Sequence, residues 1–70
     1  MIPLLLCETG EETIIKRIGG SPEVKKHLED LGFVAGGTVA VISRLGGNLI
    51  VRVKETRVAI NEDLARRIMV

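Results

Sequence analysis

Three glycine pairs, Gly19-Gly20, Gly36-Gly37 and Gly46-Gly47, divide the 70 residues of this chain into short segments. Glycine weakens the interior of a helix or a strand and is common where a chain turns, so long regular elements are not expected between the pairs. The segments are rich in Val, Ile and Leu, and β-branched residues favour strands. We therefore expect one small domain, residues 1–70, that is mainly β.

Six segments match the pattern of short strands bounded by turn residues: 4–7, 13–18, 38–45, 49–54, 57–60 and 68–70. A short helical turn near 62–66, which Asn61 can cap, precedes the last of them. Five or six such strands can close into a small β-barrel. Closure removes the exposed edges that are a hazard to a small β protein.

The strands at 49–54 and 57–60 form a hairpin if Glu55-Thr56 is its turn. The opposite pairs are then Val53 with Val58 and Val51 with Ile60. Because side chains alternate along a strand, the inner face carries Val51, Val53, Val58 and Ile60. The outer face carries Arg52, Lys54, Arg57 and Ala59.

The segment SPEVKKHLEDLG predicts one helix, at about residues 22–31, inserted between the second and third strands. Ser21 suits the N-cap and Pro22 the first helical position. One helical face is apolar, with the spacing i, i+4 and i+7, and consists of Val24, Leu28 and Leu31. We expect this face to cover one opening of the barrel.

The glycine-rich stretch LGFVAGG that follows is interpreted as a structural turn. Gly32 fits the left-handed position that ends many helices, and Phe33 then contacts Leu28. Gly36 and Gly37 turn the chain into the next strand. A phosphate-binding loop is disfavoured, because such a loop follows a strand and opens a helix, whereas these glycines close one.

No catalytic group of residues is apparent, so we do not expect an enzyme. The only Cys and the only His, Cys7 and His27, do not have metal-ligand spacing, and we interpret them as a small core residue and a half-exposed helix residue. No metal site or resident cofactor is therefore expected. Association with Fe²⁺ stays open, but no ligand cluster supports it.

The composition limits which classes of partner and which cellular location we expect. Ten basic and nine acidic side chains give no basic excess, and a single aromatic residue offers little base stacking, so nucleic acid is not expected. A single cysteine allows no internal disulfide and suits the reducing cytoplasm. The apolar run at residues 2–6 is too short to span a membrane and follows no basic residue, unlike a signal peptide.

The sharpest surface feature is a basic stripe, Arg52, Lys54 and Arg57, with Arg44 as a further candidate. It is either a solvated outer face that protects a strand edge, a contact for an acidic partner surface, or a nucleic-acid contact. We take Arg52, Lys54 and Arg57 as the candidate partner-binding residues.

The order of these features resembles the FeoA family of bacterial ferrous iron transport over essentially the whole chain. The most specific matches are the helix ending in LGF before a glycine turn and the closing pattern AxxI. The matching positions include Gly10, Glu11, Ile14, Ile15, Ile18, Gly19, Gly20, Leu28, Leu31, Gly32, Phe33, Gly36, Val39, Val41, Val51, Val53, Arg57, Val58, Ile60, Ala65 and Ile68. Two loop positions depart from the family pattern: Ala35 stands where Pro is usual, and Glu55 where Gly is common.

The resemblance implies an SH3-like β-barrel with an inserted helix and a non-enzymatic role in iron homeostasis. It also implies a partner, FeoB, a membrane permease with a cytosolic GTPase domain, through which the chain would be peripheral to the membrane. The alternative is a regulatory module that binds metal or nucleic acid, like the C-terminal domain of iron-dependent repressors. Self-association to cover apolar surface stays open.

Overall fold

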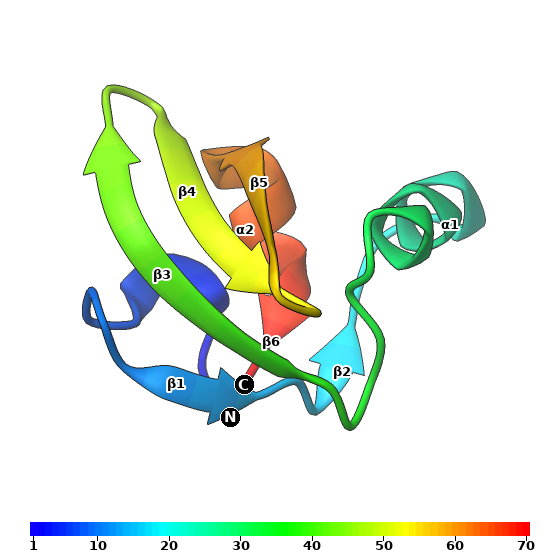
Figure 1. Ribbon diagram of the computed structural model, residues 1–70. Coiled ribbons are helices and arrows are strands. Elements are labelled where there is room, and N and C mark those ends of the chain that lie inside the picture. Colours follow the sequence, from blue (N-terminus) through cyan, green and yellow to red (C-terminus); the bar gives the residue numbers. More distant parts are fainter.

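The computed structural model describes residues 1–70 and contains two antiparallel β-sheets (Figure 1). The larger sheet has the order β1-β3-β4-β5, formed by Glu12–Ile14, Thr38–Leu45, Asn48–Val53 and Thr56–Asn61. The smaller sheet pairs β2 with β6, formed by Arg17–Ile18 and Ile68–Met69. The helices are α1, Pro22–Asp30, and α2, Glu62–Arg67. The prediction of a mainly β fold of five or six short strands with one inserted helix is confirmed.

The core lies against the inner face of the larger sheet. Alternate residues of β3, β4 and β5 on that face are at most 3% exposed: Val39, Val41, Leu49, Val51, Val53 and Ile60. The rest of the core comes from the segments that cover this face, including Leu4, Ile15, Leu28, Phe33, Ala65 and Ile68. All fifteen buried residues are hydrophobic, so burial of apolar surface provides most of the stability.

Helix α1 begins and ends as the sequence predicts. The Ser21 side chain accepts a hydrogen bond of 3.3 Å from the Val24 N–H at the N-terminus. At the other end, the Phe33 N–H donates to the Leu28 carbonyl at 2.9 Å, and Gly32 has a φ of 109°. These are the features of a Schellman ending, and Phe33 is fully buried.

The turn into β3 is formed by Gly36 and Gly37. Gly36 has a φ of 90°, and its N–H donates to the Ile15 carbonyl at 2.7 Å. The Ile15 N–H donates to the Gly37 carbonyl at 2.8 Å. The glycine turn therefore lies beside the segment between β1 and β2, and it positions α1 relative to the sheet.

The prediction of a first strand at residues 4–7 is wrong. Leu4–Leu6 form a single 3-10 turn, and the only strand-like pairing nearby is an isolated bridge between Pro3 and Met69. Leu4 is buried while Leu6 is 67% exposed. A run of leucines has no alternation that would specify a strand face, so local sequence did not determine its conformation.

The expected strand at residues 13–18 is divided between the two sheets. Glu12–Ile14 pairs with β3, whereas Arg17–Ile18 pairs with β6. The chain changes sheets at Ile15, whose backbone bonds go to the glycine turn and whose side chain enters the core. One β-branched run thus serves two sheets.

The turn between β4 and β5 is one residue earlier than predicted. It consists of Lys54 and Glu55, both with positive φ (49° and 62°), and Val53 lies opposite Thr56. The predicted pairs of Val53 with Val58 and of Val51 with Ile60 are therefore wrong, because Val58 faces Val51 and Ile60 faces Leu49. Apart from Lys54, which lies in the turn, the inner and outer faces are as predicted, since the pairing shifts by two positions and the side-chain alternation is kept.

A β-bulge at Ile42 corrects another expectation. The pairing of β3 with β4 shifts between Val41 and Ser43, so Ile42 has no partner of its own. Beyond the bulge Arg44 lies opposite Leu49, an inner-face residue, and its guanidinium donates to the Cys7 carbonyl. Arg44 is therefore not part of the basic stripe.

Candidate functional site

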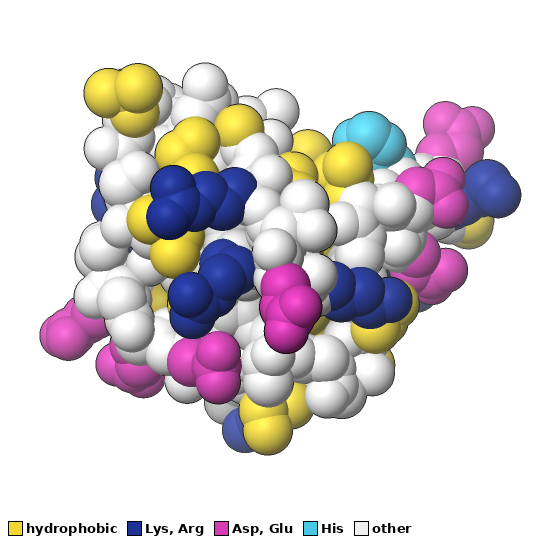
Figure 2. Space-filling model, in the orientation of Figure 1, with side chains coloured by type: hydrophobic (Ala, Val, Ile, Leu, Met, Phe, Trp, Pro, Cys, Tyr) yellow, Lys and Arg dark blue, Asp and Glu magenta, His cyan; other side chains and the backbone are white.

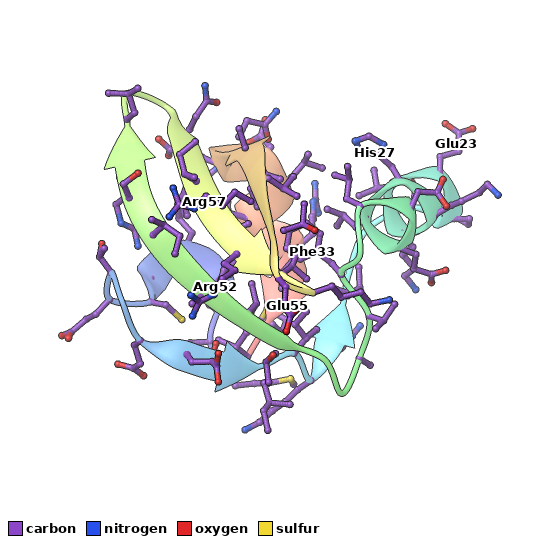
Figure 3. The ribbon with its side chains drawn as sticks, viewed as in Figure 1. Glu23, His27, Phe33, Arg52, Glu55 and Arg57 are labelled. Carbon is purple, nitrogen blue, oxygen red and sulfur yellow. The ribbon has the colours of Figure 1, made fainter.

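The candidate site is a row of side chains across the outer face of the larger sheet. The register places Glu12 opposite Ala40, Ala40 opposite Arg52, and Arg52 opposite Arg57. Three consecutive strands and the distant β1 thus place one acidic, one small and two basic residues side by side. Figure 3 shows Arg52 and Arg57 over the same face of the sheet, with Glu55 at the end of the hairpin.

The two arginines differ in their charge partners. The Arg52 guanidinium lies 3.7 Å from the Glu12 carboxylate, across Ala40, and both side chains are more than half exposed. An exposed pair at that distance contributes little to stability. Arg57 is absent from the three ion pairs of the structure, which involve only Arg52 and Arg66 among the basic residues.

Two like charges directly opposite each other destabilise a pair of strands. The Arg52–Arg57 pair is therefore unfavourable for the hairpin itself, and Glu12 offsets only part of it.

Below the arginines the surface is hollowed into a polar depression of about 440 Å³. No hydrophobic residue lines it, and its lining residues are Glu12, Thr38, Arg52, Lys54 and Glu55. The sequence predicted Lys54 on the outer face of a strand, but Lys54 belongs to the β4–β5 turn. It still borders this depression.

On the other side of the arginines the outer face is partly apolar. In the next row of the sheet, Ser43 lies opposite Ile50, and Ile50 lies opposite Ala59. Leu45, farther along β3, is 75% exposed. Figure 2 shows basic side chains with hydrophobic side chains next to them and acidic ones beyond. No helix or second sheet covers this face in Figure 1, so it is an open surface that is both basic and apolar.

Sequence reasoning missed Glu12, Thr38 and Glu55. Glu12 belongs to an acidic pair that resembles ordinary solvated turn charges, and Thr38 is an unremarkable strand residue. The pairing of β1 with β3 brings Glu12 to Arg52, and the pairing of β3 with β4 brings Thr38 to the end of β4. A preference for opposite charges across strands would have indicated some acidic partner for Arg52, but not which one.

Cys7 and His27 lie in different parts of the fold. Cys7 is buried beside the N-terminal turn, and His27 is exposed on α1 (Figure 3). No group of three or more His, Cys, Asp or Glu side chains has the arrangement of a metal site. Burial raises the pKa of the Cys7 thiol, the Glu11 carboxylate raises it further, and the Arg44 guanidinium opposes both.

A second depression, of about 410 Å³, lies at the N-terminal turn. Its lining mixes apolar and acidic residues: Ile2, Leu6, Cys7, Glu8, Glu11, Thr13 and Val70. It contains no basic side chain and lies apart from the row of Arg52 and Arg57.

No helix of the structure is both long enough and apolar enough to cross a membrane.

Comparison with known families gives a match to the FeoA domain over residues 2–70. The chain belongs to the FeoA family. A relative from Methanocaldococcus jannaschii, provisionally named Fe(2+) transport protein A, is 34% identical over 70 residues, which are the whole of this chain and 85% of that protein. The chain is also similar to an iron uptake regulatory protein (FeoA) of known crystal structure, with a TM-score of 0.90 and 31% identity, covering 97% of this chain and 90% of the other.

Two further solved structures share the fold at lower identity. FeoA of Stenotrophomonas maltophilia, determined with zinc and described as an SH3 domain protein, has a TM-score of 0.84 and 24% identity, and covers 99% of this chain and 88% of the other. A manganese-dependent transcriptional repressor has a TM-score of 0.85 and 20% identity over 94% of this chain, but only 38% of the repressor is matched. The SH3-like fold implied by the family resemblance is confirmed. Because both a transport family and a repressor use it, the fold alone does not define the activity.

Proposed function

We propose that this FeoA chain is a cytoplasmic, non-enzymatic accessory protein of ferrous iron uptake that binds a FeoB-like membrane GTPase transporter. Residues 1–70 act as one unit in this proposal. The family match and the M. jannaschii relative support the link to ferrous iron transport. Fe²⁺ is the cargo of the partner, and the chain's own role is to support the assembly or activity of that partner.

The observation that carries the proposal is the cross-strand pair of Arg52 and Arg57. The pair opposes hairpin stability, and one of its two charges has no acidic neighbour in an ion pair. A surface kept at a cost to the fold is best explained by a partner that supplies the missing negative charge. Complementary charge increases the association rate and the specificity of a protein interface more than its raw affinity.

Lys54 extends this basic surface at the end of the hairpin. It borders the polar depression together with Arg52 and Glu55, so a partner segment that contacts the arginines would also reach the turn. The adjoining Ile50 and Ala59 offer apolar contact area next to the charges. This combination favours an acidic partner surface that also presents hydrophobic side chains.

The test is capture of the transporter from detergent-solubilised membranes of iron-starved, anaerobically grown cells, with tagged protein as bait and mass spectrometry as the readout. We expect the wild type to enrich a large membrane GTPase. The double variant Arg52→Glu, Arg57→Glu should lose it by about tenfold or more, because it reverses both charges of the pair. Undiminished capture by that variant would reject this surface.

A matched control reverses two exposed lysines on α1, Lys25→Glu and Lys26→Glu, and changes the net charge by the same amount. We expect it to capture the transporter like the wild type. Loss in both variants would indicate a general charge effect and not a defined surface. If the wild type enriches only nucleic acid or a soluble regulator, the repressor-like alternative is favoured and the transporter role is rejected.

A further inference from the structure

Strand β5 is an open edge of the larger sheet. The sheet ends at Thr56–Asn61, and no backbone hydrogen bond outside the helices and strands involves a residue of this strand. The opposite edge is β1, which has only three residues against six in β5. Long open edges are templates for pairing with another chain, so β5 requires an explanation that β1 does not.

The register identifies which backbone groups are free. Val53 and Thr56 flank the two-residue turn and form a hydrogen-bonded pair. From there, hydrogen-bonded and non-hydrogen-bonded pairs alternate along an antiparallel hairpin. Val58 therefore exchanges hydrogen bonds with Val51. The N–H and C=O groups of Arg57 and Ala59 point the other way, away from β4 and past the edge of the sheet. Both residues have exposed side chains, so two donors and two acceptors face solvent along one line.

The outer-face row indicates the charge that would suit this edge. At one end of the row Glu12 pairs with Arg52, and at the other end the row stops at Arg57. A further strand beside β5 would place one residue directly opposite Arg57 on the same face. A carboxylate there would complete the row with the same charge order that Glu12 and Arg52 have at the other edge.

We propose that β5 is the docking edge for an extended, acidic segment of a partner protein, which adds as a fifth strand beside Thr56–Asn61 and places a carboxylate opposite Arg57. This inference rests on the proposed function only in that the segment belongs to the transporter. Backbone hydrogen bonds to Arg57 and Ala59 supply affinity, and the carboxylate supplies register. Side chains of the segment that lie on the outer face of the sheet, next to this carboxylate, contact Ala59 and the adjoining Ile50.

A second copy of this chain does not fit the edge as well. The sequence TRVAIN of β5 contains no acidic residue, so pairing two β5 edges adds positive charge without a carboxylate. Strand β1 of another copy does contain Glu12, but it has three residues and its carboxylate already lies beside Arg52. The charge pattern thus indicates a different protein as the occupant.

The experiment blocks the edge without changing its charge. Ala59→Pro removes the outward N–H and introduces a ring at a position where an edge strand tolerates proline, because the ladder bonds of the neighbouring residues remain. Ala59→Ser is the matched control, with a small side chain and the N–H kept. Arg57→Glu tests the charge separately, and a proton–nitrogen correlation spectrum of each variant establishes that it is folded.

We expect Ala59→Pro and Arg57→Glu each to reduce capture of the membrane GTPase by about tenfold, and Ala59→Ser to leave it unchanged. If Ala59→Pro unfolds the chain, a synthetic protein with an ester bond in place of the residue 59 amide removes the same donor and should give the same loss.

Three results would overturn the inference. Full capture by a folded Ala59→Pro or by the ester protein would mean that the partner binds side chains and not the strand edge, while the proposed function stands. Sedimentation showing a wild-type dimer that Ala59→Pro abolishes would give the edge to a second copy. Failure of the wild type itself to capture the transporter rejects the proposed function first, and this inference with it.

Discussion

The two faces of the β4–β5 hairpin come from alternate residues of the same strands, yet they follow opposite rules. On the inner face Leu49, Val51 and Ile60 are at most 3% exposed and belong to the core. On the outer face Arg52 and Arg57 lie opposite each other and remain exposed. Burial explains the residues of the inner face, whereas the like-charged pair on the outer face opposes the stability of the fold.

The turns that flank this region differ in a parallel way. The end of α1 uses glycine for its left-handed residue, Gly32, with a φ of 109°. The β4–β5 turn has two left-handed residues, Lys54 and Glu55, and neither is glycine. A side chain in that conformation costs about 1 kcal/mol or more. The helix end is thus built for stability, while the hairpin keeps charged side chains at a cost.

The largest expected effect of a substitution lies in the core. Phe33→Ala should lower the free energy of unfolding by about 3–5 kcal/mol, because the ring is fully buried and the cavity cannot collapse completely. Urea unfolding followed by circular dichroism measures it. Ile14→Ala, at a side chain 55% exposed, is the control and should cost far less. Equal losses in the two variants would mean that burial in the core is not what stabilises the fold.

The helix end should show the next largest effect. Gly32→Ala places a side chain at a φ of 109°, where it is strained, although the nearest atoms to the new Cβ are at ordinary contact distance, 3.6 Å. We expect a loss of about 1–2 kcal/mol. Gly19→Ala, which has no positive φ, serves as the control in thermal unfolding. A melting temperature for Gly32→Ala no lower than that of Gly19→Ala would contradict the Schellman ending.

The hairpin turn should respond in the opposite direction. Replacing Lys54 by Asn and Glu55 by Gly gives the dipeptide preferred when both turn residues have positive φ. We expect the free energy of unfolding to rise by about 1 kcal/mol. The same variant loses two residues that border the polar depression, so its capture of the transporter should fall. A variant that is less stable than the wild type would show that these residues are not a cost to the fold.

The smallest expected effect is a pH dependence of the free energy of unfolding, caused by the buried thiol of Cys7. Burial raises the pKa of Cys7 above its ordinary value of 9.0, so the folded state holds this proton more tightly than the unfolded state. The thiol's contribution is present below pH 9.0 and is lost as the pH rises through the folded pKa. The stability of the wild type relative to Cys7→Ala should therefore decrease above that pH in chemical unfolding experiments. A constant difference would mean that the thiol is not buried.

Several elements were predictable because local sequence determines them. Ser21 and Pro22 define the start of α1, Gly32 defines its end, and Asn61 caps α2. Strand β3 has the predicted bounds, 38–45, because glycine pairs lie on both sides of it. The same reasoning placed Arg52 and Arg57 on one face, since alternation within a strand does not depend on the turn.

The remaining features depend on contacts between distant segments. The conformation of residues 4–7 depends on the packing of Leu4 into the core. The bulge at Ile42 turns Arg44 from the outer face to the inner face of the sheet. The proximity of Glu12 to Arg52 exists only because β1 pairs with β3. The family resemblance supplied the fold and the class of partner, but it did not supply the open edge at β5.

The most direct test of the difference between the two faces is amide hydrogen exchange of the chain, alone and bound to the purified transporter. In the free protein the amides of Arg57 and Ala59 should exchange fast and that of Val58 slowly, because only Val58 lies within the ladder. On binding, we predict strong protection of Arg57 and Ala59, with little change at the inner residues. Unchanged exchange at both positions, with new protection on α1 or at the N-terminal turn, would contradict the account.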